Sequence, residues 1–293
     1  MRIPALLKAM RPEQWSKNAL VGAAWFFARG DHTQTLPENA ILRTGVGILL
    51  FCLMSSAVYL MNDLKDREFD RKHPRKKHRP IASGEVTTPQ ALGLALLLAL
   101  LSLGGAWVAA PALALVLAGY LTLQVAYSFW LKNIHLLDVI VLSAGFVLRA
   151  LAGAVALGVP ASHWLLLSTF LLALFLALCK RRHEKSVLSL EADEARPSLR
   201  GIDGKTLDGF IDVIIALNIL TYTLYGLAPE SVQKFGDRRM ILTLPWVVYG
   251  LLRDRRLVHK HQKGGQPEKQ LFCDPQMIFS YCAYLITLWL LFR

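Results

Sequence analysis

The chain has 293 residues, of which 54% are hydrophobic and 18% are charged, and its mean hydropathy is +0.39. Residues 91–130 contain no charged side chain, which is long enough for two helices across a hydrocarbon core of roughly 30 Å. These features favour a bundle of membrane-spanning helices in one domain, 1–293, over a large water-soluble domain. The net charge of +12 does not predict nucleic-acid binding, because the basic residues adjoin predicted membrane helices.

Apolar runs of suitable length predict an all-α integral membrane protein with about nine spanning helices. The start of the chain has no apolar core before its charges, so we expect no cleavable signal peptide. The first span contains Lys17, and the eighth is short for a span of about 20 residues. In chain order, the predicted spans are 14–28, 41–61, 91–109, 112–130, 137–157, 163–179, 207–227, 240–252 and 276–292.

The distribution of Lys and Arg predicts the orientation, because cytoplasmic connections retain positive charge. Nine spans place the N-terminus and alternate connections on one side, which then holds 26 of the 33 Lys and Arg residues. We therefore expect these charge-rich segments in the cytoplasm and the C-terminus outside. Part of this charge is explained by topology and by attraction to anionic membrane lipids.

An acidic stripe follows the second predicted span. If that helix continues past Met61, then Asn62, Asp63, Asp66 and Asp70 fall on one face, because their spacing follows the helical repeat. Carboxylates stacked in this way repel one another unless a cation offsets the charge. Mg²⁺ prefers such oxygen ligands and often shares its coordination with substrate phosphates, so the stripe predicts a Mg²⁺ site. The alternative is a solvated helix end with pairs between neighbouring charges.

Several cations and one tyrosine are candidate phosphate-binding residues near this site. Some of them have a simpler alternative: Lys17 could snorkel to the membrane surface, Tyr127 could belong to an interfacial aromatic belt, and Lys180 and Arg181, which end a predicted helix, could complement its dipole. Arg149 lies inside a span, which predicts a functional role, unless it only bridges to Asp138 three turns earlier. The candidate substrate-binding residues are Lys17, Asn62, Arg71, Lys76, Arg79, Tyr127, Asp138, Lys180 and Arg181, and the candidate catalytic residues are Asp63, Asp66, Asp70 and Arg149.

The segment NDLKDREFD, residues 62–70, resembles the N-D-x-x-D-x-x-x-D motif of the UbiA superfamily of intramembrane prenyltransferases. The segment RPIASGEVTTPQA that begins at Arg79 is similar to the one that follows this motif in the family. The resemblance implies nine helices, acidic cytoplasmic loops and a Mg²⁺-bound diphosphate substrate. The family's second motif, D-x-x-x-D, is not found in the connection after the sixth span; Asp208 and Asp212 have the spacing but stand at the start of the seventh.

Further segments resemble one branch of that superfamily, the decaprenyl-phosphate phosphoribosyltransferases. They are RPEQWSKN at 11–18, HPRKKHRP at 73–80, GFVLRALAG at 145–153 and KRRHE at 180–184. This resemblance implies transfer of phosphoribosyl from phosphoribosyl diphosphate (PRPP) to a polyprenyl phosphate in a bacterial plasma membrane, as a step of cell wall biosynthesis. Membrane lipids are then partners, and a homo-oligomer is compatible with the sequence.

Two other functions stay open. One is transfer of a prenyl group from a prenyl diphosphate to an aromatic acceptor, which is the usual UbiA-type reaction. The other is cation transport, which predicts acids near the bilayer midplane in broken helices, whereas these acids gather at one membrane face. The four cysteines and the histidines show no metal-binding spacing, so we expect no zinc site.

Overall fold

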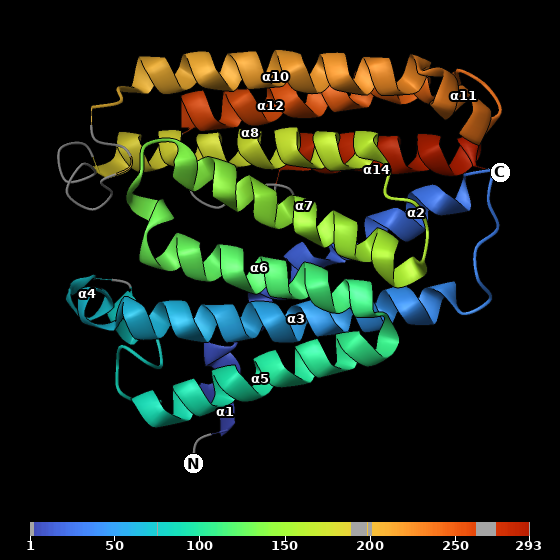
Figure 1. Ribbon diagram of the computed structural model, residues 1–293. Helices are drawn as coiled ribbons and strands as arrows, with labels where there is room; N and C mark the ends of the chain where they lie inside the picture. The colour runs from blue at the N-terminus through green and yellow to red at the C-terminus, as the bar shows by residue number, and fades with distance from the viewer. Residues whose placement is uncertain (1–2, 75, 189–197, 199–200, 262–273, 293) are drawn as a thin grey trace. The chain divides into compact units, whose positions relative to one another are not determined.

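The computed structural model describes residues 3–74, 76–188, 198, 201–261 and 274–292, and within these ranges the chain is helical without a strand. The helices are arranged along the chain as Figure 1 shows. They are α1 Ile3–Ala9, η1 Pro12–Gly22, α2 Ala23–Arg29, α3 Ala40–Lys65, α4 Arg67–Lys72, η2 Lys76–His78, α5 Thr88–Ala109, α6 Pro111–Phe129, η3 Leu131–Asn133, α7 Leu137–Leu157, α8 His163–Leu188, α10 Gly204–Leu227, α11 Pro229–Phe235, η5 Arg239–Thr243, α12 Leu244–His261 and α14 Pro275–Leu291.

Six helices in the described part of the chain are long and apolar enough to cross a membrane, namely α3, α5, α6, α7, α8 and α10. They coincide with six of the predicted spans, and the prediction of an all-α, multi-pass membrane protein is confirmed. α8 differs in length, because it continues to Leu188 through the basic residues that the prediction placed after the span. The count of nine is not confirmed.

The three remaining predicted spans have other forms. The first is a 3-10 helix, η1, followed by the short helix α2. The eighth is the 3-10 turn η5 followed by α12, which continues to His261. Because the second half of α12 is charged, α12 is not among the helices that are apolar enough to cross a membrane. The ninth is α14, an apolar helix of 17 residues. A 3-10 segment of 11 residues is unusually long, since such runs rarely exceed three or four residues.

Two compact units divide the chain. The first contains residues 1–25, 37–130 and 148–161, and the second contains residues 26–36, 131–147 and 162–293. Helix α7 contributes residues to both. Each unit is described on its own below, and a single domain stays a prediction.

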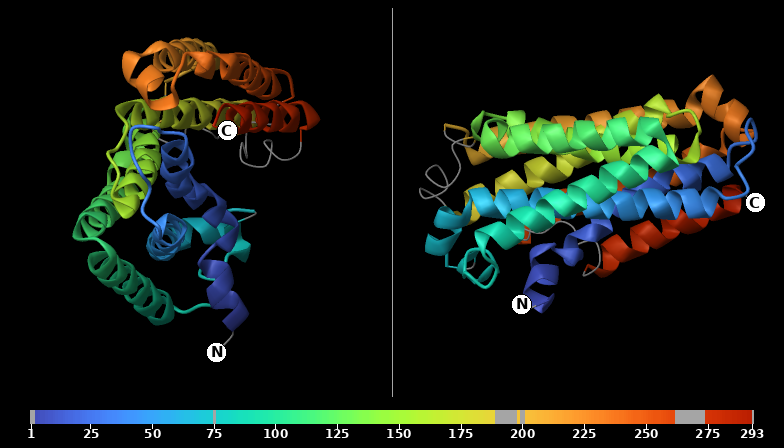
Figure 2. Two further views of the ribbon diagram at one scale, coloured as in Figure 1. Left: turned by 90° about the vertical axis from the view of Figure 1, so that its right-hand side faces the viewer. Right: turned by 60° about the horizontal axis from the view of Figure 1, so that its bottom comes forward.

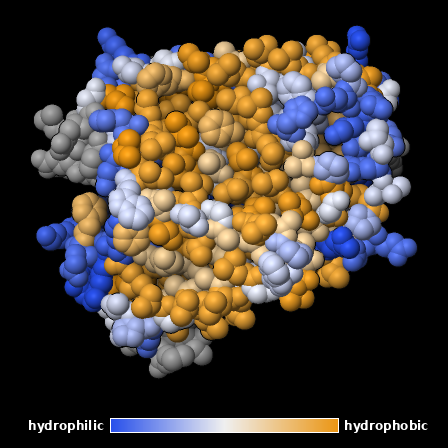
Figure 3. Space-filling model, in the orientation of Figure 1, coloured by the Kyte–Doolittle hydropathy of each residue, from blue (hydrophilic) through white to orange (hydrophobic). Residues whose placement is uncertain are grey.

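In the first unit, α3 packs along α5, and α5 packs along α6 (Figures 1 and 2). The turn at Ala110 joins α5 to α6, and Pro111 begins α6, where a missing N–H costs nothing. The buried core includes Phe51, Met54 and Leu117. Large apolar side chains on the outer faces of α5 and α6 are exposed, as lipid contact requires (Figure 3).

In the second unit, α8 lies along α10 and α12 lies along α14 (Figure 1). Phe175, Cys179, Ile211 and Leu251 belong to a buried core to which α8, α10 and α12 contribute. Asp203 caps α10, because its side chain accepts a hydrogen bond of 2.7 Å from the backbone N–H of Thr206. The hydrogen bonds and the charge of Arg253 hold the pKa of the Asp274 carboxyl, which caps α14, below its usual range.

Gly153 allows α7 to approach η1 closely. A Cβ added there would lie 2.0 Å from the carbonyl oxygen of Val21, which is backbone and cannot turn aside. We expect Gly153→Ala to destabilise the fold by about 1–3 kcal/mol or more. The measurement is thermal unfolding of the purified protein in detergent. Gly104→Ala is the matched control, because a Cβ there would meet nothing within 4 Å; equal melting temperatures for the two variants would contradict this account.

Candidate functional site

The acidic segment is close to the predicted continuous helix but contains a break. α3 ends at Lys65 and α4 begins at Arg67, with Asp66 between them at φ −87° and ψ 5°. The backbone N–H of Asp66 still donates to the carbonyl of Asn62 (2.9 Å), and that of Asp70 to the carbonyl of Asp66 (2.8 Å). The helix thus continues past Met61, as the stripe required, and helical hydrogen bonding across Asp66 preserves the register of the stripe.

Asp63 and Asp70 are brought together by Arg79. Both acids are almost completely buried, with 3% and 1% of their surface exposed. One guanidinium nitrogen of Arg79, Nη1, donates to Asp63 Oδ1 at 3.2 Å and to Asp70 Oδ2 at 2.6 Å. A buried carboxylate is costly unless it is paired, and here a single cation pairs two. We call Asp63 and Asp70 the acidic pair.

One carboxylate oxygen of the acidic pair is available to bind a metal ion. Asp70 Oδ1 is buried and accepts no hydrogen bond within the described residues, and it lies 3.8 Å from Lys76 Nζ. Two carboxylates with an available oxygen fit Mg²⁺, which commonly binds one or two carboxylates together with phosphate oxygens.

The four predicted ligands are not gathered into one group. The described residues contain no set of three His, Cys, Asp or Glu side chains that could hold a metal ion. Asn62 Oδ1 accepts a hydrogen bond from Ser128 at 3.2 Å, and Asp66 is only half-buried. Asn62 and Asp66 therefore stay predicted metal ligands. Asp63 and Asp70 are the two acids that Arg79 brings together.

Arg11 is a residue of the site that the sequence prediction omitted. Its guanidinium Nη2 donates to Asp63 Oδ1, so Asp63 contacts two arginines. Arg11 also lies over the ring of Tyr59, with 5.4 Å between its Cζ and the ring centroid. The sequence contained a signal for it, because Arg11 opens the RPEQWSKN segment of the family resemblance.

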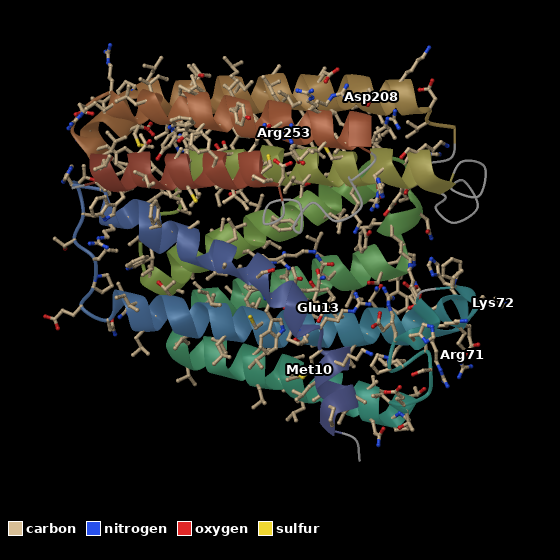
Figure 4. All side chains as sticks on the ribbon, turned by 180° about the vertical axis from the view of Figure 1, so that it is seen from behind. Met10, Glu13, Arg71, Lys72, Asp208 and Arg253 are labelled. Atoms are coloured by element: carbon tan, nitrogen blue, oxygen red, sulfur yellow. The ribbon has the colours of Figure 1, made fainter. Side chains whose placement is uncertain are left out.

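Three other predicted substrate-binding residues belong to the first unit. Arg71 is exposed on α4 (Figure 4), where it donates to Glu68 at 2.9 Å and to the carbonyl of Ala82 at 3.2 Å. Lys17 in η1 and Tyr127 near the end of α6 are half-buried. The roles of Lys17, Arg71 and Tyr127 in binding substrate stay predictions.

Arg149 is at the centre of a buried polar network in the first unit. Its Nε donates to Asn18 Oδ1 and its Nη2 to the hydroxyl of Tyr120, both at 2.9 Å. The guanidinium also faces the rings of Phe51 and Tyr120, with 5.2 and 4.9 Å to the centroids. Asn18 in turn donates to Ser55 Oγ at 3.0 Å. Arg149 therefore joins α7 to η1, α3 and α6 through residues buried among apolar side chains.

Asp138, in the second unit, pairs with Arg181 rather than with Arg149. Arg181 Nε donates to Asp138 Oδ2 at 2.7 Å, and each side chain is 2% exposed. Arg181 also donates to Glu184 at 2.8 Å, and Ser198 donates to Asp138 at 3.2 Å. Asp138 is thus held by Arg181 and Ser198, and Arg149 by Asn18 and Tyr120, rather than by each other. Lys180, beside Arg181, is half-buried on α8.

Removing one member of this buried pair should destabilise the second unit. We expect Asp138→Ala to cost about 3–5 kcal/mol, because the charge of Arg181 is left without its main partner. Thermal unfolding would show a lower melting temperature than that of Asp237→Ala, an acid whose contact with Arg239 is exposed. An unchanged melting temperature for Asp138→Ala would contradict the structural role of the pair.

Asp208 and Asp212, which have the D-x-x-x-D spacing, are both paired with arginine. Asp208, labelled on α10 in Figure 4, accepts from Arg182 at 3.1 Å and lies 3.4 Å from Arg255. Asp212 accepts from Arg255 at 2.8 Å. Two arginines thus already neutralise the two acids and tie α10 to α8 and α12. Nearby on α12, burial raises the pKa of Asp254 to about 6.

Comparison with known proteins agrees with this architecture. Residues 19–273 match the UbiA prenyltransferase family. A decaprenyl-phosphate phosphoribosyltransferase of Mycolicibacterium smegmatis is 42% identical over 80% of this chain and 73% of its own. Another of Mycobacterium tuberculosis is 40% identical over 97% of this chain and 93% of its own. A third of Corynebacterium glutamicum is 37% identical over 92% of this chain and 81% of its own.

Solved structures share the fold. A UbiA homologue from Archaeoglobus fulgidus, bound to GPP and Mg²⁺, has a TM-score of 0.71 at 19% identity, over 98% of this chain and 99% of that chain. The same homologue bound to DMAPP and Mg²⁺ has a TM-score of 0.70 at 19% identity, over 98% of each chain. The family match covers most of the sequence, and the helical fold agrees with it. The chain belongs to the UbiA prenyltransferase family, a family of transferases.

Proposed function

We propose that the chain transfers the 5-phosphoribosyl group of PRPP to decaprenyl phosphate or a similar polyprenyl phosphate, with release of diphosphate. The names of three relatives that are 37–42% identical support this reaction. The observation that carries the proposal is the acidic pair, buried and bridged by Arg79 at the end of a membrane-spanning helix. Acids of this kind, with Lys76 and Arg11 beside them, suit a diphosphate that is bound together with a divalent cation.

Each group of residues has a distinct role in this proposal. Asp63 and Asp70 would hold Mg²⁺, with Asn62 and Asp66 as further predicted ligands. When bound, the ion would neutralise the negative charge that builds up on the departing diphosphate. Arg79 and Lys76 bind the phosphate oxygens of the donor, because guanidinium and ammonium groups form charge-assisted hydrogen bonds with them. Lys17, Arg71, Tyr127, Asp138, Lys180 and Arg181 are proposed as further substrate-binding residues, and Arg149 as a catalytic one.

The acceptor places few demands on proton transfer. A polyprenyl phosphate is ionised near neutral pH, so its oxygen can attack C1 of the ribose without help from a general base. The new bond joins C1 to that oxygen, while the bond from C1 to the diphosphate breaks and its electron pair leaves with the diphosphate. The protein would therefore contribute positioning and electrostatic stabilisation, which can account for a large share of enzymatic acceleration.

The proposed location is the cytoplasmic face of a bacterial plasma membrane. The acidic stripe and η2 lie in a connection with eight Lys and Arg residues between positions 65 and 79, and such connections favour the cytoplasm. PRPP is a soluble anion and decaprenyl phosphate is a lipid, so a site at the membrane surface gives access to both.

The direct test is product formation. Purified full-length protein is incubated in detergent with radiolabelled PRPP, decaprenyl phosphate and Mg²⁺, and the lipid extract is analysed for a labelled phosphoribosyl lipid. We expect this product only when both substrates are present. If no such product forms, and a prenyl diphosphate is instead transferred to an aromatic acid, the usual UbiA-type reaction replaces the proposal.

Removal of divalent cations should abolish the reaction. We expect excess EDTA to lower the rate of product formation at least about 100-fold, because uncompensated carboxylates and diphosphate would repel each other. Activity should return when Mg²⁺ is added beyond the chelator. Full activity in EDTA would argue against a metal at the acidic pair.

A further inference from the structure

Arg11 contacts the acidic pair from a strained backbone conformation. It has φ 54° and ψ 59°, in the left-handed region that residues other than glycine seldom adopt. Its guanidinium donates to Asp63 Oδ1, the same oxygen that Arg79 contacts. Strain of this kind persists only where the surroundings impose it, and it is often found at functional sites.

The surroundings that impose it are visible on both sides of Arg11. The carbonyl of Met10 accepts a hydrogen bond from Ser56 Oγ at 3.1 Å, and Trp15 Nε1 donates to the same Oγ at 3.0 Å. Further along η1, Asn18 is fully buried between Ser55 and Arg149. Figure 4 labels Met10 and Glu13, which lie on either side of Arg11 in the chain. The segment is thus fastened to α3, and Arg11 is held where it meets Asp63.

The charged groups around the acidic pair do not favour the binding of a metal ion by itself. The two carboxylates of the acidic pair are contacted by three cations, Arg11, Arg79 and Lys76. Among these five groups three are positive and two are negative, an arrangement that disfavours the binding of a divalent cation without an anion. A diphosphate, which brings several negative charges, removes that obstacle.

We infer that Arg11 is an internal counter-ion of Asp63. When a diphosphate binds, it replaces Asp63 as the partner of the Arg11 guanidinium, and only then is Asp63 released to bind the metal. This inference rests on the proposed function, which assigns a diphosphate and a divalent cation to the acidic pair. Arg11 is then a diphosphate-binding residue, and metal and diphosphate bind together rather than one after the other. By linkage, each ligand raises the affinity for the other by the same factor.

The test uses two probes with the full-length protein in detergent. Mn²⁺ stands for Mg²⁺, and its binding in the absence of any phosphate is followed by loss of the free-ion EPR signal. Radiolabelled inorganic pyrophosphate is titrated in the presence of Mg²⁺ by filter binding. For Arg11→Gln we expect opposite shifts: Mn²⁺ alone binds more tightly and pyrophosphate binds more weakly, each by about 5- to 150-fold.

Two further variants secure the comparison. Arg29→Gln removes an exposed arginine on α2 and should leave both affinities unchanged. Arg11→Gly removes the guanidinium and also suits the left-handed backbone, so it is expected to fold even if Arg11→Gln does not. Its two affinities should shift as in Arg11→Gln.

An unchanged or weaker affinity for Mn²⁺ in these variants overturns the inference, and so does unchanged binding of pyrophosphate. Neither measurement requires transfer to a lipid. A protein that shows the opposite shifts but makes no phosphoribosyl lipid would keep the inference and lose the proposed donor.

Discussion

Asp63→Asn and Asp70→Asn should each lower the rate of transfer from PRPP to polyprenyl phosphate by at least about 100-fold. The substitution keeps the shape of the side chain and removes one negative charge from the pair that Arg79 bridges. Arg79 keeps one carboxylate partner in either variant, so we expect the protein to stay folded. The measurement is the initial rate of labelled lipid product, with thermal unfolding as a check on the fold.

Glu68→Gln is the matched control for these two variants. Glu68 belongs to α4, as Asp70 does, but its side chain is 75% exposed and pairs with Arg71. We expect near-normal activity. Comparable losses in all three variants would mean that the overall charge of the segment matters rather than the acidic pair.

Asp66→Asn separates two interpretations of the stripe. The sequence predicts Asp66 as a catalytic residue and metal ligand, so we expect this variant to lose activity while the protein stays folded. Activity close to normal would remove Asp66 from the site and leave the two buried acids as the essential ones.

Arg149→Ala should abolish transfer and also lower the melting temperature. Its removal leaves Asn18 Oδ1 and the hydroxyl of Tyr120 without the donor that each has in the structure. An unsatisfied buried polar group costs about 1–3 kcal/mol, so two of them would be a large part of the stability of a typical protein. The expected loss of activity follows in part from η1, since Asn18 fixes the segment that carries Arg11.

A double-mutant cycle with Asn18→Ala distinguishes the roles of Arg149. If the two residues act as one network, the destabilisation in the double variant will be smaller than the sum of the single ones, with a coupling of about 0.5–3 kcal/mol. If Arg149→Ala is fully stable and inactive, Arg149 contacts substrate instead. Retained activity would exclude Arg149 from the site altogether.

The local sequence was sufficient for most of the helical architecture. Uncharged runs such as 91–130 predict membrane helices because the bilayer requires long apolar segments with internal hydrogen bonds. Where the structure differs from the predicted spans, polar side chains are present. η1 is a 3-10 helix with Trp15 and Asn18 bonded to α3, and α8 runs on through Lys180 and Arg181.

The sequence by itself determined the acidic stripe and the class of helical membrane protein, because spacing along one helix and apolar length are properties of short segments. Only the tertiary structure decided which charges meet. It brings Arg79 to both Asp63 and Asp70, adds Arg11 from 52 residues away, and pairs Asp138 with Arg181 instead of Arg149. Such pairings depend on how helices that are distant in the chain pack, and buried charges must find partners wherever that packing places them.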